Sequence, residues 1–179
     1  MNNIRLFMLT LSLLLLLPLQ IFGQCSEGDC ANGQGTFTFP DGVKYTGAFK
    51  DNQPDGQGHY IKPDGVRYEG GFKKGFRHGQ GTLTLPNGIQ FTGTFNAGKI
   101  NGQGKYSDPR TGEEYAGSFS NSLPDGQGTM TKPDGYKYAG AWRKGQRHGY
   151  GAETLAGGEE RAGYWQSDRY VGKEQPQEP

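Results

Sequence analysis

The chain has 179 residues, of which 32 are glycine and 10 are proline, while only 32% are hydrophobic. This composition argues against a large compact core, because few aliphatic side chains remain once a leucine-rich N-terminal stretch is set aside. Nineteen basic and eighteen acidic side chains nearly cancel, so no overall field would attract nucleic acid, and we expect no nucleic-acid partner.

Residues 1–23 have the layout of a secretory signal peptide. One basic residue, Arg5, precedes a leucine-rich run over 6–17, and the small residue Gly23 lies at a position suited to cleavage. The apolar run is short for a membrane span, and no basic stop-transfer flank follows it. We therefore expect an exported protein, periplasmic or extracellular. The alternative is an uncleaved anchor that tethers the chain to a membrane.

The segment 24–44 contains the only two cysteines, Cys25 and Cys30, separated by four residues. In an oxidising compartment, a local disulfide that closes the start of the first hairpin is the favoured interpretation. A redox or metal role is disfavoured, because the spacing is not Cys-x-x-Cys and no histidine lies nearby. A lipid-modified Cys25 ranks third, because Gln24 stands where that signal has a small residue.

From residue 45 onward the chain repeats with a period of 23 residues, broken by one 24-residue unit. A Tyr-x-Gly-x-Phe start and a Gly-x-Gly mark recur in step, which indicates an array of stacked units. The full units are 45–67, 68–90, 91–114, 115–137 and 138–160. A degraded copy at 161–172 is interpreted as a capping repeat, and the polar segment 173–179 as a disordered tail.

Each unit predicts two strands. The alternation of Tyr-x-Gly-x-Phe places both aromatics and the glycine on one face, and a ring from an adjacent strand is expected to cover that glycine. The second residue after Gly-x-Gly shares this face, with Glu153 as the exception among Phe37, Tyr60, Leu83, Tyr106 and Met130. We expect an all-β fold, an elongated single-layer antiparallel meander about 55–65 Å long.

Two kinds of turn connect these strands. Pro-Asp-Gly or Pro-Asn-Gly at 40–42, 63–65, 86–88 and 133–135 predicts tight turns. The opposite connections, at 50–55, 73–78, 96–101, 120–125 and 143–148, are expected to be longer and more variable.

Together, the Tyr-x-Gly-x-Phe start, the Arg-His-Gly sequence, Gly-x-Gly and the Asp-Gly turn resemble the MORN repeat family over roughly residues 31–166. The resemblance implies a repeat array. In the family, such arrays act as scaffolds in junctional membrane proteins and as accessory regions beside lipid kinase and methyltransferase domains.

No pattern in the chain predicts an active site, a metal site or a cofactor. The histidines are His59, His78 and His148, and the last two fill the repeat's Arg-His-Gly sequence, which favours a structural role. No serine or cysteine nucleophile has a partner base. The Asp-Gly turns lack the carboxylate density of a calcium array, and no helix follows Gly-x-Gly to hold a phosphate. We expect no enzymatic activity.

The leading functional hypothesis is an exported scaffold that binds a protein partner through an aromatic groove on the uncovered face of the sheet. The alternative for the same rings is that they form the core. The predicted groove residues are Tyr45, Phe49, Tyr68, Phe72, Phe91, Phe95, Tyr115, Phe119, Tyr138 and Trp142.

Two further hypotheses remain open. Basic turn tips could hold an anionic lipid headgroup, although solvated turns would look the same; these residues are Lys73, Lys74, Arg77, Arg143, Lys144 and Arg147. The chain could also be an accessory subunit of an enzyme on another chain. Finally, the free strand edges at the two ends of the meander could pair with another copy.

Overall fold

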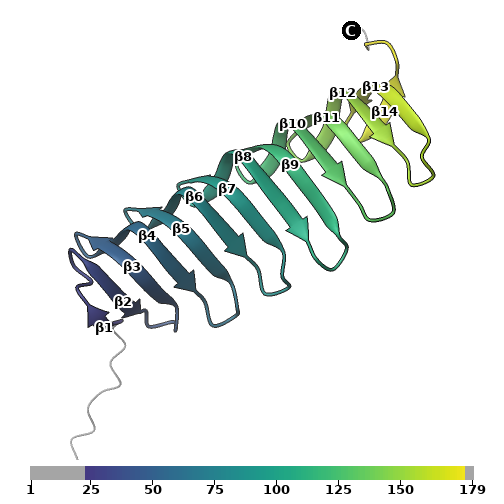
Figure 1. Ribbon diagram of the computed structural model, residues 1–179. Helices are drawn as coiled ribbons and strands as arrows, with labels where there is room; N and C mark the ends of the chain where they lie inside the picture. Colours follow the sequence, from purple (N-terminus) through teal and green to yellow (C-terminus); the bar gives the residue numbers. More distant parts are fainter. Residues whose placement is uncertain (1–22, 176–179) are drawn as a thin grey trace, which may run out of the picture.

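A computed structural model describes residues 23–175, which form one sheet of 14 antiparallel strands (Figure 1). Each strand pairs with the next in sequence, so the predicted all-β, single-layer meander is confirmed. Residues 1–22 and 176–179, which hold most of the expected signal segment and tail, lie outside the described residues. The strands are β1 (Gln24–Gly28), β2 (Gln34–Thr38), β3 (Lys44–Lys50), β4 (Gln53–Ile61), β5 (Arg67–Lys73), β6 (Phe76–Thr84), β7 (Gln90–Asn96), β8 (Lys99–Asp108), β9 (Glu113–Ser120), β10 (Leu123–Thr131), β11 (Lys137–Arg143), β12 (Gln146–Thr154), β13 (Glu160–Gln166) and β14 (Arg169–Gly172).

The two edges of the sheet carry different connections, and the lengths expected from the sequence are wrong for both. The Pro-Asp-Gly connections are the longer ones: residues 39–43 join β2 to β3. The opposite connections have only two residues, such as Asp51 and Asn52 between β3 and β4. Their φ values of 50° and 62° place both in the left-handed region. Two-residue hairpins favour this geometry because it follows the twist of the strands.

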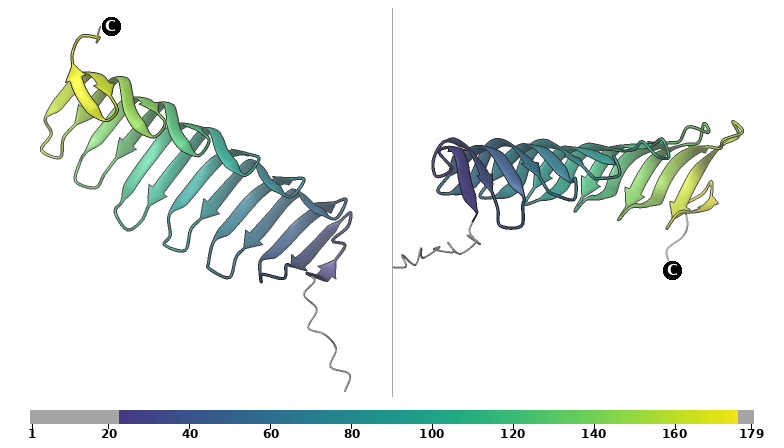
Figure 2. Two further views of the ribbon diagram at one scale, coloured as in Figure 1. Left: turned by 180° about the vertical axis from the view of Figure 1, so that it is seen from behind. Right: turned by 90° about the horizontal axis from the view of Figure 1, so that it is seen from below.

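The residues that the sequence assigned to long turns belong to the even-numbered strands. In β4 the register jumps from Gly58, opposite Gly47, to Pro54, opposite Phe49. Gly56 lies inside this irregularity at φ 111°, a conformation that favours glycine. Figures 1 and 2 show the result along the whole sheet: the strands bend, and the two-residue tips curl over one face. We call this the ring face.

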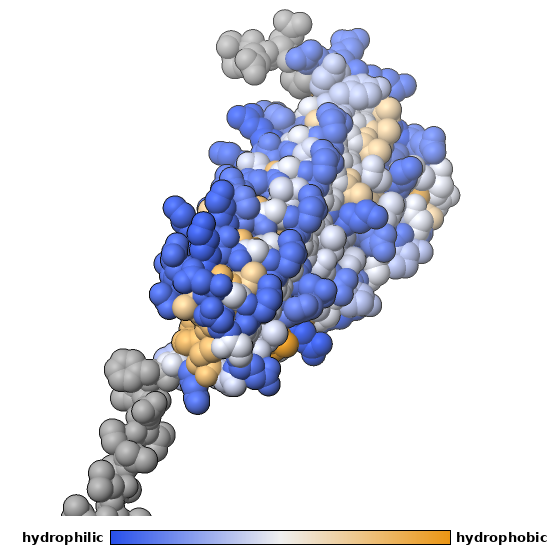
Figure 3. Space-filling model, turned by 60° about the vertical axis from the view of Figure 1, so that its left-hand side comes forward, coloured by the Kyte–Doolittle hydropathy of each residue, from blue (hydrophilic) through white to orange (hydrophobic). Residues whose placement is uncertain are grey.

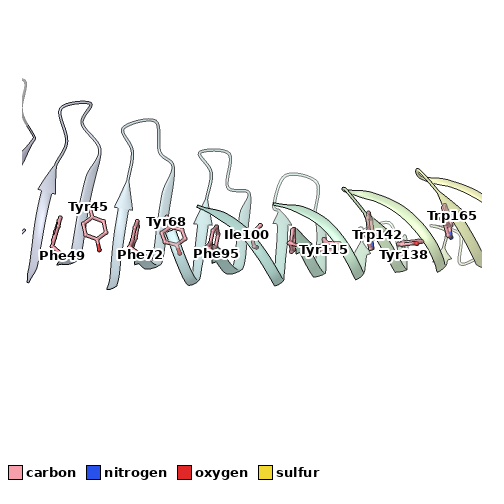
Figure 4. Packing of buried hydrophobic residues seen from close by; sticks show 11 residues of the cluster. Tyr45, Phe49, Tyr68, Phe72, Phe95, Ile100, Tyr115, Tyr138, Trp142 and Trp165 are labelled. Carbon is pink, nitrogen blue, oxygen red and sulfur yellow. The ribbon is translucent and has the colours of Figure 1, made fainter. Parts of the chain in front are cut away.

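Eleven buried side chains form the core, and they follow one another along the length of the ring face (Figure 4). Tyr45 packs edge-to-face on Phe49 of its own unit, with ring centroids 5.0 Å apart, and on Phe72 of the next unit at 4.9 Å. Pairs of this kind contribute about 0.5–1.5 kcal/mol beyond the burial of their area. The core is therefore a ladder of rings that joins neighbouring units. Its members are Tyr45, Phe49, Tyr68, Phe72, Phe95, Ile100, Tyr115, Phe119, Tyr138, Trp142 and Trp165.

The glycines make room for the tyrosine rings. A Cβ on Gly58 in β4 would overlap the ring of Tyr45 in the adjacent strand β3, while Gly47, opposite, faces the backbone of Gly58 and the Tyr45 hydroxyl. An adjacent-strand ring thus covers the glycine of Gly-x-Gly, whereas the sequence suggested this for Gly47. The Tyr45 hydroxyl donates to the carbonyl of Ala48 at 2.9 Å, which satisfies it within the core.

The third unit solves the same packing problem differently. It starts with Phe91, which is half-buried and packs against Tyr106 with ring centroids 5.2 Å apart. The core position is taken by Ile100 of β8, whose Cδ1 lies against the sites where Gly93 and Gly104 would carry a Cβ. An aliphatic side chain from the return strand thus replaces the missing tyrosine.

Candidate functional site

Burial decides what the predicted groove residues do. Nine of the ten are at most 6% exposed, and only Phe91 is half-buried. The curled tips cover the rings that a flat single layer would have left open. The expectation of an open groove lined by these ten rings is therefore corrected: nine of them are core.

A second row of apolar side chains remains partly open on the same face. Its members come from the even-numbered strands and pack against the core while keeping part of their surface accessible. We call it the open row, and it consists of Phe37, Tyr60, Leu83, Tyr106 and Met130. In the space-filling view most of the visible surface is hydrophilic, and apolar side chains gather at the N-terminal end of the sheet (Figure 3).

Two hollows on the ring face lie at equivalent positions of the repeat, 70 residues apart. The first hollow has a volume of about 490 Å³ and is lined by Tyr60, Lys62, Val66, Phe72, Gly75, Phe76, Arg77, Leu83, Leu85 and Gly98. The second hollow has about 430 Å³ and is lined by Met130, Lys132, Asp134, Tyr136, Trp142, Gly145, Arg147, Glu153 and Asp168. Both volumes fall in the range of ligand-binding clefts.

A buried carboxylate dominates the second hollow. Glu153 is 3% exposed and accepts hydrogen bonds from the hydroxyl of Tyr136 at 2.8 Å and from Arg147 and Arg161 at 2.6 Å each. The two guanidinium groups also stack on Trp165, at 4.2 and 5.2 Å from the ring centroid. Two cations and a hydroxyl compensate the burial of this charge. Glu153, which breaks the apolar row in the sequence, therefore joins β12 to the last hairpin.

The first hollow has the opposite character. Leu83 occupies the position of Glu153, and none of its lining residues is acidic. Arg77 donates from Nη2 to the carbonyl of Gly98 at 2.8 Å, and its guanidinium lies 5.7 Å from the Tyr68 ring centroid. Phe76 at the rim is 61% exposed, the largest exposed fraction of the big apolar side chains in residues 23–175. The hollow is apolar with a basic rim.

The six predicted lipid-binding residues separate into two groups. Lys73, Lys74, Arg143 and Lys144 lie exposed at two-residue turns or beside them. Arg77 and Arg147 do not lie at the tips. They extend along the ring face, where each bonds the next hairpin and stacks on core rings.

Neighbouring tips are held together by two interchangeable bonds. After Pro54, Asp55 Oδ2 accepts from the backbone N–H of Lys74 at 3.1 Å. In the next unit Arg77 replaces the proline and donates to the carbonyl of Gly98. The equivalent residues 70 positions later make the same two bonds. Sequence reasoning missed this function, although the alternation of Pro-Asp with Arg-His at fixed repeat positions was its signal.

The remaining sequence candidates have structural surroundings. Cys25 and Cys30 are joined by a disulfide with Cα atoms 6.0 Å apart, and β1, which contains Cys25, is exposed throughout. His78 and His148 are half-buried strand residues, and His59 is exposed. Within residues 23–175, no group of three or more metal-binding side chains comes together. Nor does this range contain a helix long and apolar enough to cross a membrane.

The family model of the MORN repeat matches residues 31–44, 45–67, 68–90, 91–110, 115–135 and 138–160. The chain belongs to the MORN repeat family. MORN repeats are non-catalytic units that generally mediate protein or membrane interactions. No curated protein sequence matches the chain.

Among solved structures, the chain is similar to the TCP domain of Drosophila melanogaster SAS-4 (dCPAP), in complex with a proline-rich motif of Ana2 (dSTIL). The two are 9% identical with a TM-score of 0.36, and the match covers 80% of this chain and 90% of that chain.

Proposed function

We propose that this MORN repeat protein is an exported, non-catalytic scaffold that holds a protein partner on its ring face. The observation that carries the proposal is the open row, a line of half-buried apolar side chains that continues across consecutive hairpins beside two hollows. Contiguous apolar surface of this kind is typical of interaction sites. The buried core rings support the row from below and are not its contact surface.

Export fits the chemistry at the N-terminal end. A signal-like segment precedes residue 24, and the disulfide between Cys25 and Cys30 is of a type that persists in oxidising compartments. Intact mass of the protein from its native fraction, without reductant, tests this. A chain beginning near Gln24 and two hydrogens light supports export with a closed disulfide. A full-length mass supports a membrane tether.

The partner proposal is tested by substitution in the open row. Leu83→Ser and Met130→Ser change half-buried side chains, and Lys105→Ala on the opposite face is the control. After cross-linking in the native fraction, a partner recovered with wild type and with the control should be lost from the row variants, while all melting curves stay cooperative. Recovery of the same partner with both row variants would refute the proposal.

Anionic lipid binding is the second candidate, and one observation favours it. Lys73 and Lys74 flank a turn that ends at the exposed Phe76, an apolar side chain beside two cations. Lys73→Gln together with Lys74→Gln should abolish sedimentation with vesicles that contain phosphatidylserine. Unchanged sedimentation of this variant would remove the candidate.

A further inference from the structure

We infer that the first hollow binds a short extended peptide segment in which a large apolar side chain stands next to a carboxylate. This deepens the proposed scaffold function and rests on it. The inference starts from two hollows with the same backbone frame and different side chains, because residues 70 positions apart in the repeat line them.

The apolar half of the ligand follows from the floor of the first hollow. Tyr60, Val66, Leu83 and Leu85 are all only half-buried, so they present apolar surface toward the hollow. Phe76 adds an exposed ring at the rim, where the equivalent position in the fifth unit is Gln146. A large apolar side chain seated here would remove this surface from water.

The carboxylate follows from the cations. Lys62 and Arg77 form no ion pair within residues 23–175. Their equivalents in the second hollow are both neutralised: Lys132 pairs with Glu113 at 2.6 Å, and Arg147 with Glu153 and Asp168. The first hollow thus has two cations without an internal counter-ion, which an anionic ligand group would supply.

Nearby acids do not fill this role. Asp55 accepts a hydrogen bond from the N–H of Lys74, and Asp64 from the N–H of Val66, so both serve the local backbone. The hollow also lies along the open row, which passes from Tyr60 through Leu83 to Tyr106. An extended peptide can follow such a row, and this favours a peptide over a compact small molecule.

The test is a nuclear magnetic resonance titration of the exported chain with blocked peptides that differ in one residue. Phenylalanine is followed by glutamate, glutamine or lysine, and decanoate is a separate probe. The glutamate peptide should shift the amide signals of Tyr60, Lys62 and Leu83, and the lysine peptide should bind about tenfold more weakly.

The two hollows provide matched controls. Phe76→Gln and Lys62→Glu should each weaken binding of the glutamate peptide, whereas Lys132→Glu, the same change in the second hollow, should leave it unchanged. Phe76 is mostly exposed, so Phe76→Gln keeps the fold and the result interpretable. Leu83→Glu gives the first hollow the acid of the second and should abolish binding.

Three outcomes overturn the inference: equal binding of the glutamate and lysine peptides, shifts confined to the second hollow, or binding of decanoate alone. The scaffold proposal can fail separately. If a partner is lost on Leu83→Ser while the peptides show no preference for glutamate, the inference is wrong and the scaffold stands. If the peptides behave as expected but no partner depends on the open row, the scaffold proposal is wrong.

Discussion

A methyl group on Gly81 should destabilise the fold through one ring. Gly81 lies beneath Tyr68, and a Cβ there would overlap the ring and its hydroxyl oxygen. The ring cannot move aside easily, because it is 1% exposed and packs on Phe72 at 5.2 Å and on Phe95 at 5.0 Å. Displacing it also breaks the 3.1 Å hydrogen bond from its hydroxyl to the carbonyl of Gly71.

The magnitude of this effect can be estimated from its parts. Overpacking costs about 1–3 kcal/mol and the lost hydrogen bond about 1 kcal/mol. The lower entropy of the unfolded chain returns roughly 0.5–1 kcal/mol on replacing glycine by alanine. Gly81→Ala should therefore lower the free energy of unfolding by about 1–3 kcal/mol. Urea denaturation followed by circular dichroism should show an earlier midpoint.

Two comparisons make this prediction specific to the ring. Gly157→Ala is the control, because a Cβ at Gly157 meets nothing within 4 Å, and it should be neutral or slightly stabilising. In a Tyr68→Leu background the side chain no longer reaches over Gly81, so most of the cost of Gly81→Ala should disappear. An equal loss in both backgrounds, or equal effects of Gly81→Ala and Gly157→Ala, would refute the reasoning.

Three further predictions concern the core and its ends. Burial raises the pKa of each of the four buried core tyrosines to about 12, above the ordinary value near 10. The stability that this provides is intact below pH 10 and is lost as the pH rises towards 12, so circular dichroism should show alkaline unfolding; retention of the sheet at pH 12 would contradict this. Ile100→Ala should cost about 2–5 kcal/mol in urea denaturation and Phe91→Ala less, because Ile100 has taken the core position; the reverse order would contradict the assignment. Glu153→Gln should lower the unfolding midpoint reported by fluorescence of the two tryptophans in the C-terminal units by about 1–3 kcal/mol, since it leaves two guanidinium groups around a neutral amide; no change would show that the cluster adds nothing to stability.

Much of the architecture is determined by the sequence alone. A 23-residue period with paired marks can only be satisfied by stacked units, and the alternation within Tyr-x-Gly-x-Phe assigns the faces of each strand. Family, fold class and the set of side chains on the ring face followed from these local regularities, because a strand's alternation depends on its own backbone and not on distant contacts.

Tertiary structure decided which of those side chains are accessible. The left-handed turn at Asp51 and Asn52 and the bend at Gly56 set how far each tip curls, and that curl buries Tyr45 and its equivalents while leaving Tyr60 open. Ile100 enters the core and Arg77 lies along the ring face through contacts between separate strands and units. Neither outcome can be read from one unit, because burial in a single-layer sheet depends on how hairpins about 23 residues apart bend over one another.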